Sequence, residues 1–399
     1  MNPYAKRFKR FVGNSIRAVH RRLLALEYDI PGEEIQSQAL QSLGFALPTA
    51  ETWAISREVL ALLAPKMEQA GLRDGWLPYL QRGIERSRAE GDVATEGELH
   101  YHLGLLHELR VRFDDAGRCY AKSASLFAAL GEAQKEARAI SRQAYVARLQ
   151  QRHEQALALA ERALSLAPEG SPEHAGCCFT LGTIAFDRRE WETSIRWFRA
   201  SLAAWETLGD RRMVAFALRN LGPALHWTRA YDEAIVCYKR ALAIFVEIPD
   251  PVHQALTRMN LGIVYSLTGQ SERSLALYAQ AEPVFRRTED DLRLALLYGN
   301  MGYANRQLSR WQAAEEGYRL SIERWRRIGV KASAVNGLDG LGLVLLGSGR
   351  LEEALAVLDE ALATLAEIPD DPRYDYLHQM VTGHRKQAEK ARRGNTNEE

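Results

Sequence analysis

Long apolar runs are missing from this chain of 399 residues, and so is an excess of charge of either sign. Without about 18 consecutive apolar residues, no segment predicts a membrane span. The 52 basic and 51 acidic residues leave a net charge of +1. The overall balance therefore favours neither nucleic acid nor an anionic membrane as a partner.

Cysteine is scarce as well, and its spacing forms no C-x-x-C pair: the four are Cys119, Cys177, Cys178 and Cys237. Such spacing predicts reduced thiols rather than a disulfide framework or a zinc site. We expect no metal and no cofactor. The positively charged N-terminus is not followed by an apolar segment, so it does not predict a secretory signal. The expected location is the cytoplasm.

Catalytic motifs are also lacking. The sequence contains no Ser-His-Asp set, paired-carboxylate motif or HExxH, and the glycine-rich residues 337–349 lack the lysine of a phosphate loop. We therefore expect no enzyme and no small-molecule substrate. His100 and His107 share a helical face and could hold a metal, but they fall on core positions of the repeat described next, so we interpret them as packed side chains.

The chain has instead a repeat with a period of 40 residues. A Leu-Gly pair, or a near relative, recurs, and five of the six intervals between its second residues are 40 residues long. Those second residues are Gly104, Ala144, Gly182, Gly222, Gly262, Gly302 and Gly342. Slots are numbered from this residue below. Slots +12 and +19 hold small residues throughout, and slot +16 is usually aromatic, as in Tyr238 and Tyr278.

This pattern predicts a helical hairpin in each repeat. The glycine allows close approach of the second helix, and we expect the aromatic to fill the space between one hairpin and the next. Each hairpin leaves an apolar face that only a neighbour can cover. Pro223, directly after a repeat glycine, predicts a kink or an interruption of its helix. Trp227 lies outside the core slots and is expected to be exposed.

The repeat resembles the tetratricopeptide family in its 40-residue variety, which occurs in cytosolic adaptors and in the sensor arms of bacterial signalling ATPases. The resemblance implies an all-α, right-handed superhelical solenoid of about seven to eight helix-turn-helix repeats with capping helices at both ends. We expect a basic amphipathic arm and capping helices over 1–50, a degenerate capping repeat over 51–92, seven repeats over 93–370, and a C-terminal capping helix with a short tail over 371–399.

The resemblance also implies that the chain is a protein-interaction scaffold or adaptor whose concave groove holds a peptide or helix of a partner. Slot −2 of three central repeats carries an asparagine, and an amide can bond a peptide main chain whatever its side chains are. The surrounding arginines favour an acidic or C-terminal segment. The predicted groove residues are Asn220, Asn260, Asn300, Arg142, Tyr145, Arg148, Arg219, His226, Tyr303 and Arg306. Alternatively, Asn-Leu-Gly is only a packing triplet of this repeat.

The N-terminal arm supports an alternative function. Residues 1–22 carry seven lysines and arginines and no acid, and apolar residues from Tyr4 to Leu23 recur at steps of three and four. This is a basic amphipathic helix, either a cap on the solenoid or a docking segment. Through residues 1–24 the chain would be a nucleic-acid- or membrane-associated regulator. The sequence does not indicate the oligomeric state.

Overall fold

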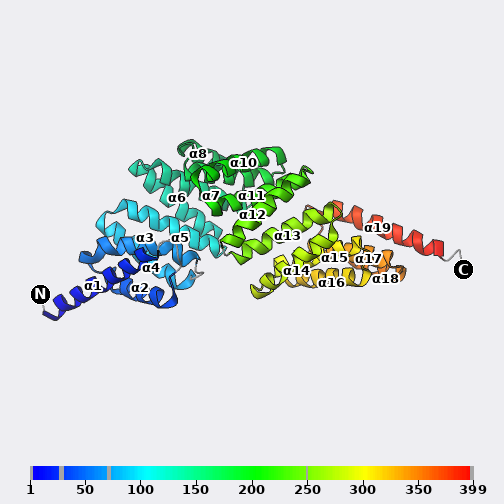
Figure 1. Ribbon diagram of the computed structural model, residues 1–399, viewed down its shortest axis with the longest axis horizontal. Coiled ribbons are helices and arrows are strands. Elements are labelled where there is room, and N and C mark those ends of the chain that lie inside the picture. The colour runs from blue at the N-terminus through cyan, green and yellow to red at the C-terminus, as the bar shows by residue number, and fades with distance from the viewer. Residues whose placement is uncertain (1–2, 27–30, 70–72, 249, 396–399) are drawn as a thin grey trace. The chain divides into compact units, whose positions relative to one another are not determined.

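The computed structural model describes residues 3–26, 31–69, 73–248 and 250–395, and within these ranges the chain is helical without a strand (Figure 1). The chain divides into two compact units, residues 1–209 and 210–399. Each unit is a row of antiparallel helix pairs in which every helix contacts the next one along the chain. No helix among the described residues is long and apolar enough to cross a membrane.

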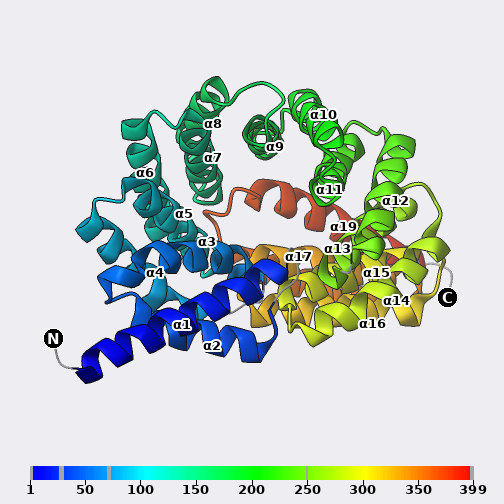
Figure 2. The ribbon, with the colours of Figure 1, turned by 60° about the vertical axis from the view of Figure 1, so that its left-hand side comes forward.

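The first unit begins with α1 (Pro3–Ala25), α2 (Glu33–Ala46) and the short 3-10 helix η1 (Ala50–Thr52). Four helix pairs follow. They are α3 (Trp53–Gln69) with α4 (Arg73–Glu90), α5 (Val93–Leu109) with α6 (Phe113–Leu130), α7 (Ala133–Leu149) with α8 (His153–Leu166), and α9 (Pro172–Asp187) with α10 (Trp191–Leu208). Figure 2 shows α7 beside α8 and α1 beside α2.

The second unit contains four pairs and a closing helix. They are α11 (Arg211–Trp227) with α12 (Tyr231–Glu247), α13 (Pro251–Leu267) with α14 (Ser271–Arg287), α15 (Asp291–Gln307) with α16 (Trp311–Arg327), and α17 (Lys331–Gly347) with α18 (Leu351–Ala366). Helix α19 (Tyr374–Asn395) packs on α17 and α18 through the buried side chains Leu377, Val381 and Ala388. The seven pairs from α5 to α18 carry the seven repeat glycine slots.

The aromatic of slot +16 lies against the glycine of its own hairpin. A methyl group added at Gly262 would stand 2.3 Å from the ring of Tyr278, and one at Gly222 would stand 2.3 Å from the ring of Tyr238. The expectation that this ring fills only the space between hairpins is therefore wrong. The ring occupies the room that the missing Cβ leaves, although Tyr318 also reaches Gly340 of the following repeat.

Small residues of the second helix add hydrogen bonds at this contact. The hydroxyls of Ser194 and Ser274, both at slot +12, donate to the carbonyl oxygens of Gly182 and Gly262 at 2.8 and 2.7 Å. The buried hydroxyl therefore meets an acceptor on the first helix, which offsets the cost of removing it from water.

Pro223 lies inside α11, and the helix continues through it to Trp227. The expected interruption is therefore wrong. Proline removes one backbone N–H, but Pro223 lies on a partly exposed side of α11, while the neighbouring Gly222 makes the contact with α12. The interhelix packing thus holds α11 together across the missing bond. Trp227 is 57% exposed, which confirms the expectation for that side chain.

Candidate functional site

The first helices of the second unit form a layer, because α11 contacts α13, α13 contacts α15 and α15 contacts α17. On each of these helices the glycine side packs on the second helix. Slots −10, −6, −2, +1 and +5 recur at steps of four, four, three and four, so they share one side of the helix. On α11, α13 and α15 these slots are partly buried or exposed. We call this set on the three helices the asparagine face.

The three predicted asparagines occupy equivalent places on α11, α13 and α15, and each is partly buried. They differ in their hydrogen bonds. The amide of Asn220 donates to the carbonyl oxygen of Phe216, one turn earlier, at 2.8 Å. Within the described part of the chain, the amides of Asn260 and Asn300 make no such bond. These two amides are therefore free to bond a ligand.

Apolar side chains surround the amides, which the residue pattern did not lead us to expect. Trp227 at slot +5 is 57% exposed, Leu267 in the same slot is 41% exposed, and Leu296 at slot −6 is 42% exposed. Leu256, Ile263 and Tyr303 are partly buried on the same side. Counting the four-and-three steps outward from each asparagine would have found them. No acidic residue occupies any slot of the asparagine face.

The predicted cations lie along one edge of this face, because slots −3 and +4 are both rotated to the same side of slot −2. The guanidinium of Arg219 lies 5.2 Å from the ring centre of Phe216, and that of Arg306 lies 5.4 Å from that of Tyr303. His226 stacks on Trp227 with 5.5 Å between ring centres, and burial lowers the pKa of His226, so it is neutral at pH 7.

The other three predicted residues, Arg142, Tyr145 and Arg148, belong to α7 in the first unit. Both guanidiniums lie near the Tyr145 ring, at 5.9 and 4.9 Å from its centre. Arg142 pairs with Glu108 at 3.4 Å, and Arg148 pairs with Asp187 at 3.5 Å. These charges are already neutralised, so an acidic ligand would have to compete with two carboxylates of the chain itself.

The histidines of α5 show how burial suppresses charge. His100 lies 3.1 Å from a guanidinium nitrogen of Arg88 and 3.6 Å from a carboxylate oxygen of Glu96. Burial, and after it the charge of Arg88, lowers the pKa of His100 to about 4. Among the described residues there is no group of three or more His, Cys, Asp or Glu side chains able to hold a metal ion.

Comparison with known proteins gives a match to the tetratricopeptide repeat over residues 214–287 and 293–367, which include the asparagine face. The human cell division cycle protein 16 homolog is 32% identical over 114 residues. This alignment covers 28% of the present chain and only 17% of the human protein, so the chain spans less than a fifth of that relative's length.

Two solved structures share the fold over most of the chain. The Signal Transduction ATPase with Numerous Domains from Pyrococcus horikoshii, which has a tetratricopeptide-repeat sensor, is 16% identical, with a TM-score of 0.58 over 90% of this chain and 54% of that chain. A Rap protein complexed with Competence and Sporulation Factor is 13% identical, with a TM-score of 0.54 over 95% of this chain and 99% of that chain. With its 40-residue period, paired helices and family match, the chain is a tetratricopeptide-repeat protein.

Proposed function

We propose that the protein is an interaction scaffold and that the asparagine face binds a segment of a partner protein. The observation that carries this proposal is the pair of open amides, Asn260 and Asn300, at equivalent places on two helices in contact. Each amide offers donors and an acceptor to a peptide bond. In the same fold, the Rap protein holds Competence and Sporulation Factor.

The spacing of the amides suits an extended segment. Packed helices lie about 8–10 Å apart, and an extended chain rises about 3.3 Å per residue. Asparagines one repeat apart would therefore meet about every third residue of a partner. Between these main-chain contacts, the exposed Leu267 and Leu296 would bury apolar side chains of the segment. Apolar burial supplies affinity, while the amides set the register.

The edge of the face suggests where acidic groups of the partner would lie. Arg219 and Arg306 each present a guanidinium beside an aromatic ring, and a carboxylate is the preferred planar partner of such a group. We propose that the bound segment carries an acidic side chain or its own C-terminal carboxylate along this edge.

The test is selection of binding peptides from a random displayed library on the intact protein, followed by affinity measurement on Asn260→Ala, Asn300→Ala and the variant with all three asparagines changed to Ala. The triple variant is expected to lose at least about 2 kcal/mol of binding free energy, about 30-fold in Kd. Asn220→Ala should matter least of the single changes, because its amide is engaged with Phe216.

Gln312→Ala is the matched control, since it removes an exposed amide from the second helix α16. Its affinity and melting temperature should equal those of the parent chain. If the triple variant binds the selected peptides as well as the parent does, or loses binding only by unfolding, the proposal is wrong. The carboxylate is tested separately: amidating the C-terminus of a peptide should weaken binding to the parent more than to the Arg219→Gln, Arg306→Gln variant.

A further inference from the structure

Helix α1 uses only one of its sides to pack on the fold. Val12, Ile16, Val19 and Leu23 are at most 3% exposed and belong to the core that α1 shares with α2 and α3. The cap predicted from sequence is therefore present in the second half of the helix. The aromatic residues of the first half are not part of it.

Three aromatic side chains of α1 are exposed to solvent. Tyr4, Phe8 and Phe11 are 80%, 53% and 69% exposed, and their spacing of four and three places them on one side of the helix. Phe45 of α2, itself 52% exposed, extends this group, with its ring centre 6.0 Å from that of Phe8. Large rings gathered at a surface are not explained by the fold, and such apolar patches mark interaction sites.

Cations without carboxylate partners lie beside these rings. Helix α1 contains no acidic residue. Three of its basic side chains are paired with acids of neighbouring elements: Lys9 with Glu51, His20 with Glu58, and Arg22 with Glu34. Five others form no ion pair with any described residue. They are Lys6, Arg7, Arg10, Arg17 and Arg21.

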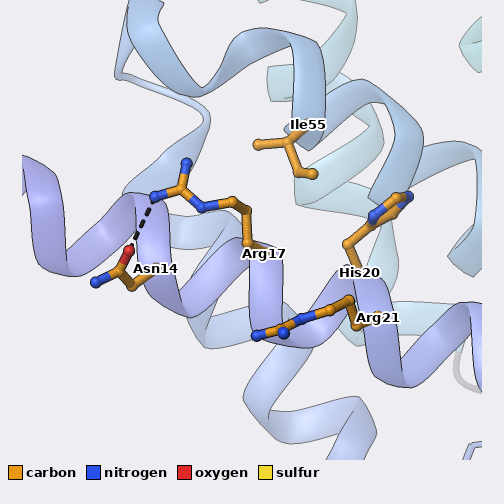
Figure 3. A pocket seen from close by; sticks show the side chains of 5 residues that line it. All are labelled: Asn14, Arg17, His20, Arg21 and Ile55. Carbon is orange, nitrogen blue, oxygen red and sulfur yellow. Dashed lines mark hydrogen bonds between the residues drawn. The ribbon is translucent and has the colours of Figure 1, made fainter.

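The unpaired cations form a row on the helix. Lys6, Arg10, Arg17 and Arg21 recur at steps of four, seven and four and so lie on one side, with Arg7 between this row and the rings. Arg17 and Arg21 also line an open pocket of about 630 Å³ with Asn14, His20 and Ile55 of α3, where Arg17 bonds only Asn14, at 2.9 Å (Figure 3). A row of positive charge that the chain leaves uncompensated suits a negatively charged surface.

We infer that α1 is a docking surface for an anionic lipid bilayer. The rings would enter the boundary between headgroups and acyl chains, and the cations would contact the anionic headgroups. The four exposed rings favour a bilayer over a nucleic acid, because a phosphate backbone would use the cations but leave apolar area in water. This surface is independent of the asparagine face.

The test is co-sedimentation of the full chain with phosphatidylcholine vesicles that do or do not contain phosphatidylserine. The parent chain should bind only vesicles with phosphatidylserine. Lys6→Gln, Arg7→Gln and Arg10→Gln together should reduce the partition coefficient on the order of 100-fold. Phe8→Ser with Phe11→Ser should reduce it about tenfold or more. All these side chains are exposed or carry no packing contact of the core, and circular dichroism checks that the variants fold.

The matched controls change exposed residues of the second unit. Lys239→Gln with Arg287→Gln removes two cations, and Val236→Ser removes a side chain that is 63% exposed. Both should bind vesicles as the parent does, and so should the triple asparagine variant. Absence of vesicle binding, equal binding to uncharged vesicles, or indifference to either set of α1 changes would overturn the inference. Tighter binding of α1 to single-stranded or duplex DNA than to vesicles at the same salt concentration would also overturn it.

Discussion

At the scale of single residues, the closest contacts in the molecule are those between a glycine and an aromatic ring. Gly262 faces Tyr278, whose side chain is fully buried, so the ring has no solvent-filled space into which it could move. Other helical glycines are different: around Gly383 in α19, an added Cβ would meet nothing within 4 Å. The two kinds of glycine predict opposite effects of the same substitution.

Gly262→Ala is therefore expected to overpack the α13–α14 hairpin and to lower the free energy of unfolding by about 1–3 kcal/mol. Hydrogen exchange should show the lost protection in residues 251–287. Gly383→Ala is the control, and it should be neutral or stabilising by up to about 1 kcal/mol because alanine favours the helix. Equal melting temperatures for the two variants would contradict the packing described here.

A second prediction at this scale concerns pH. The pKa of His100 is about 4 in the folded chain, against about 6.5 for an exposed histidine. Between these values the unfolded chain takes up a proton that the folded chain refuses, so the free energy of unfolding falls as the pH is lowered from about 6.5 to about 4. His100→Gln should flatten this part of the melting-temperature profile. The same slope in both proteins would show that other groups cause it.

At the scale of the hairpin, the turn between its two helices has a constant backbone conformation but not a constant residue. Slot +7 has a positive φ in all seven repeats. Glycine occupies it at Gly269 and Gly349, whereas the other five repeats have a side chain there, including Val111 with a φ of 59°. A β-branched residue is strained in this region. The ends of two helices and their packing hold Val111 in that conformation.

Val111→Gly should relieve this strain and raise the free energy of unfolding by about 0.5–1 kcal/mol, after subtraction of the entropy that glycine loses on folding. Little burial is lost, because Val111 is 70% exposed. Thermal melting measures the change. The reverse substitution, Gly349→Val with a φ of 81° at that position, should lower the melting temperature. A fall in both variants would refute strain at this slot.

At the scale of the whole molecule, contacts run between neighbours along the chain. Charged side chains on the outside link adjacent repeats: Arg152 lies 3.5 Å from Asp114, and Arg212 lies 3.2 Å from Asp250, each across 38 residues. Exposed pairs of this kind contribute little singly. The buried helix interfaces carry most of the coupling, and each reaches only to the next hairpin.

A local lesion should therefore stay local. Gly104→Ala would press on Tyr120 in the first unit, and Gly302→Ala would press on Tyr318 in the second. Hydrogen exchange of the first variant should lose protection in α5 and α6 while α15 to α18 keep theirs, and the second variant should show the converse. Loss of protection throughout the chain in either variant would mean that the repeats unfold as one cooperative body.

The sequence by itself determined the helices, their pairing and the slots, because a 40-residue period and spacings of three and four residues are local properties of a helix. It also placed Asn220, Asn260 and Asn300 on one side of successive first helices. Only the tertiary structure decided that Asn220 bonds its own helix, that exposed leucines surround the other two amides, and that Tyr4, Phe8 and Phe11 stay outside the core. These properties depend on which side chains meet across helices, and the spacing of residues within one helix does not specify that.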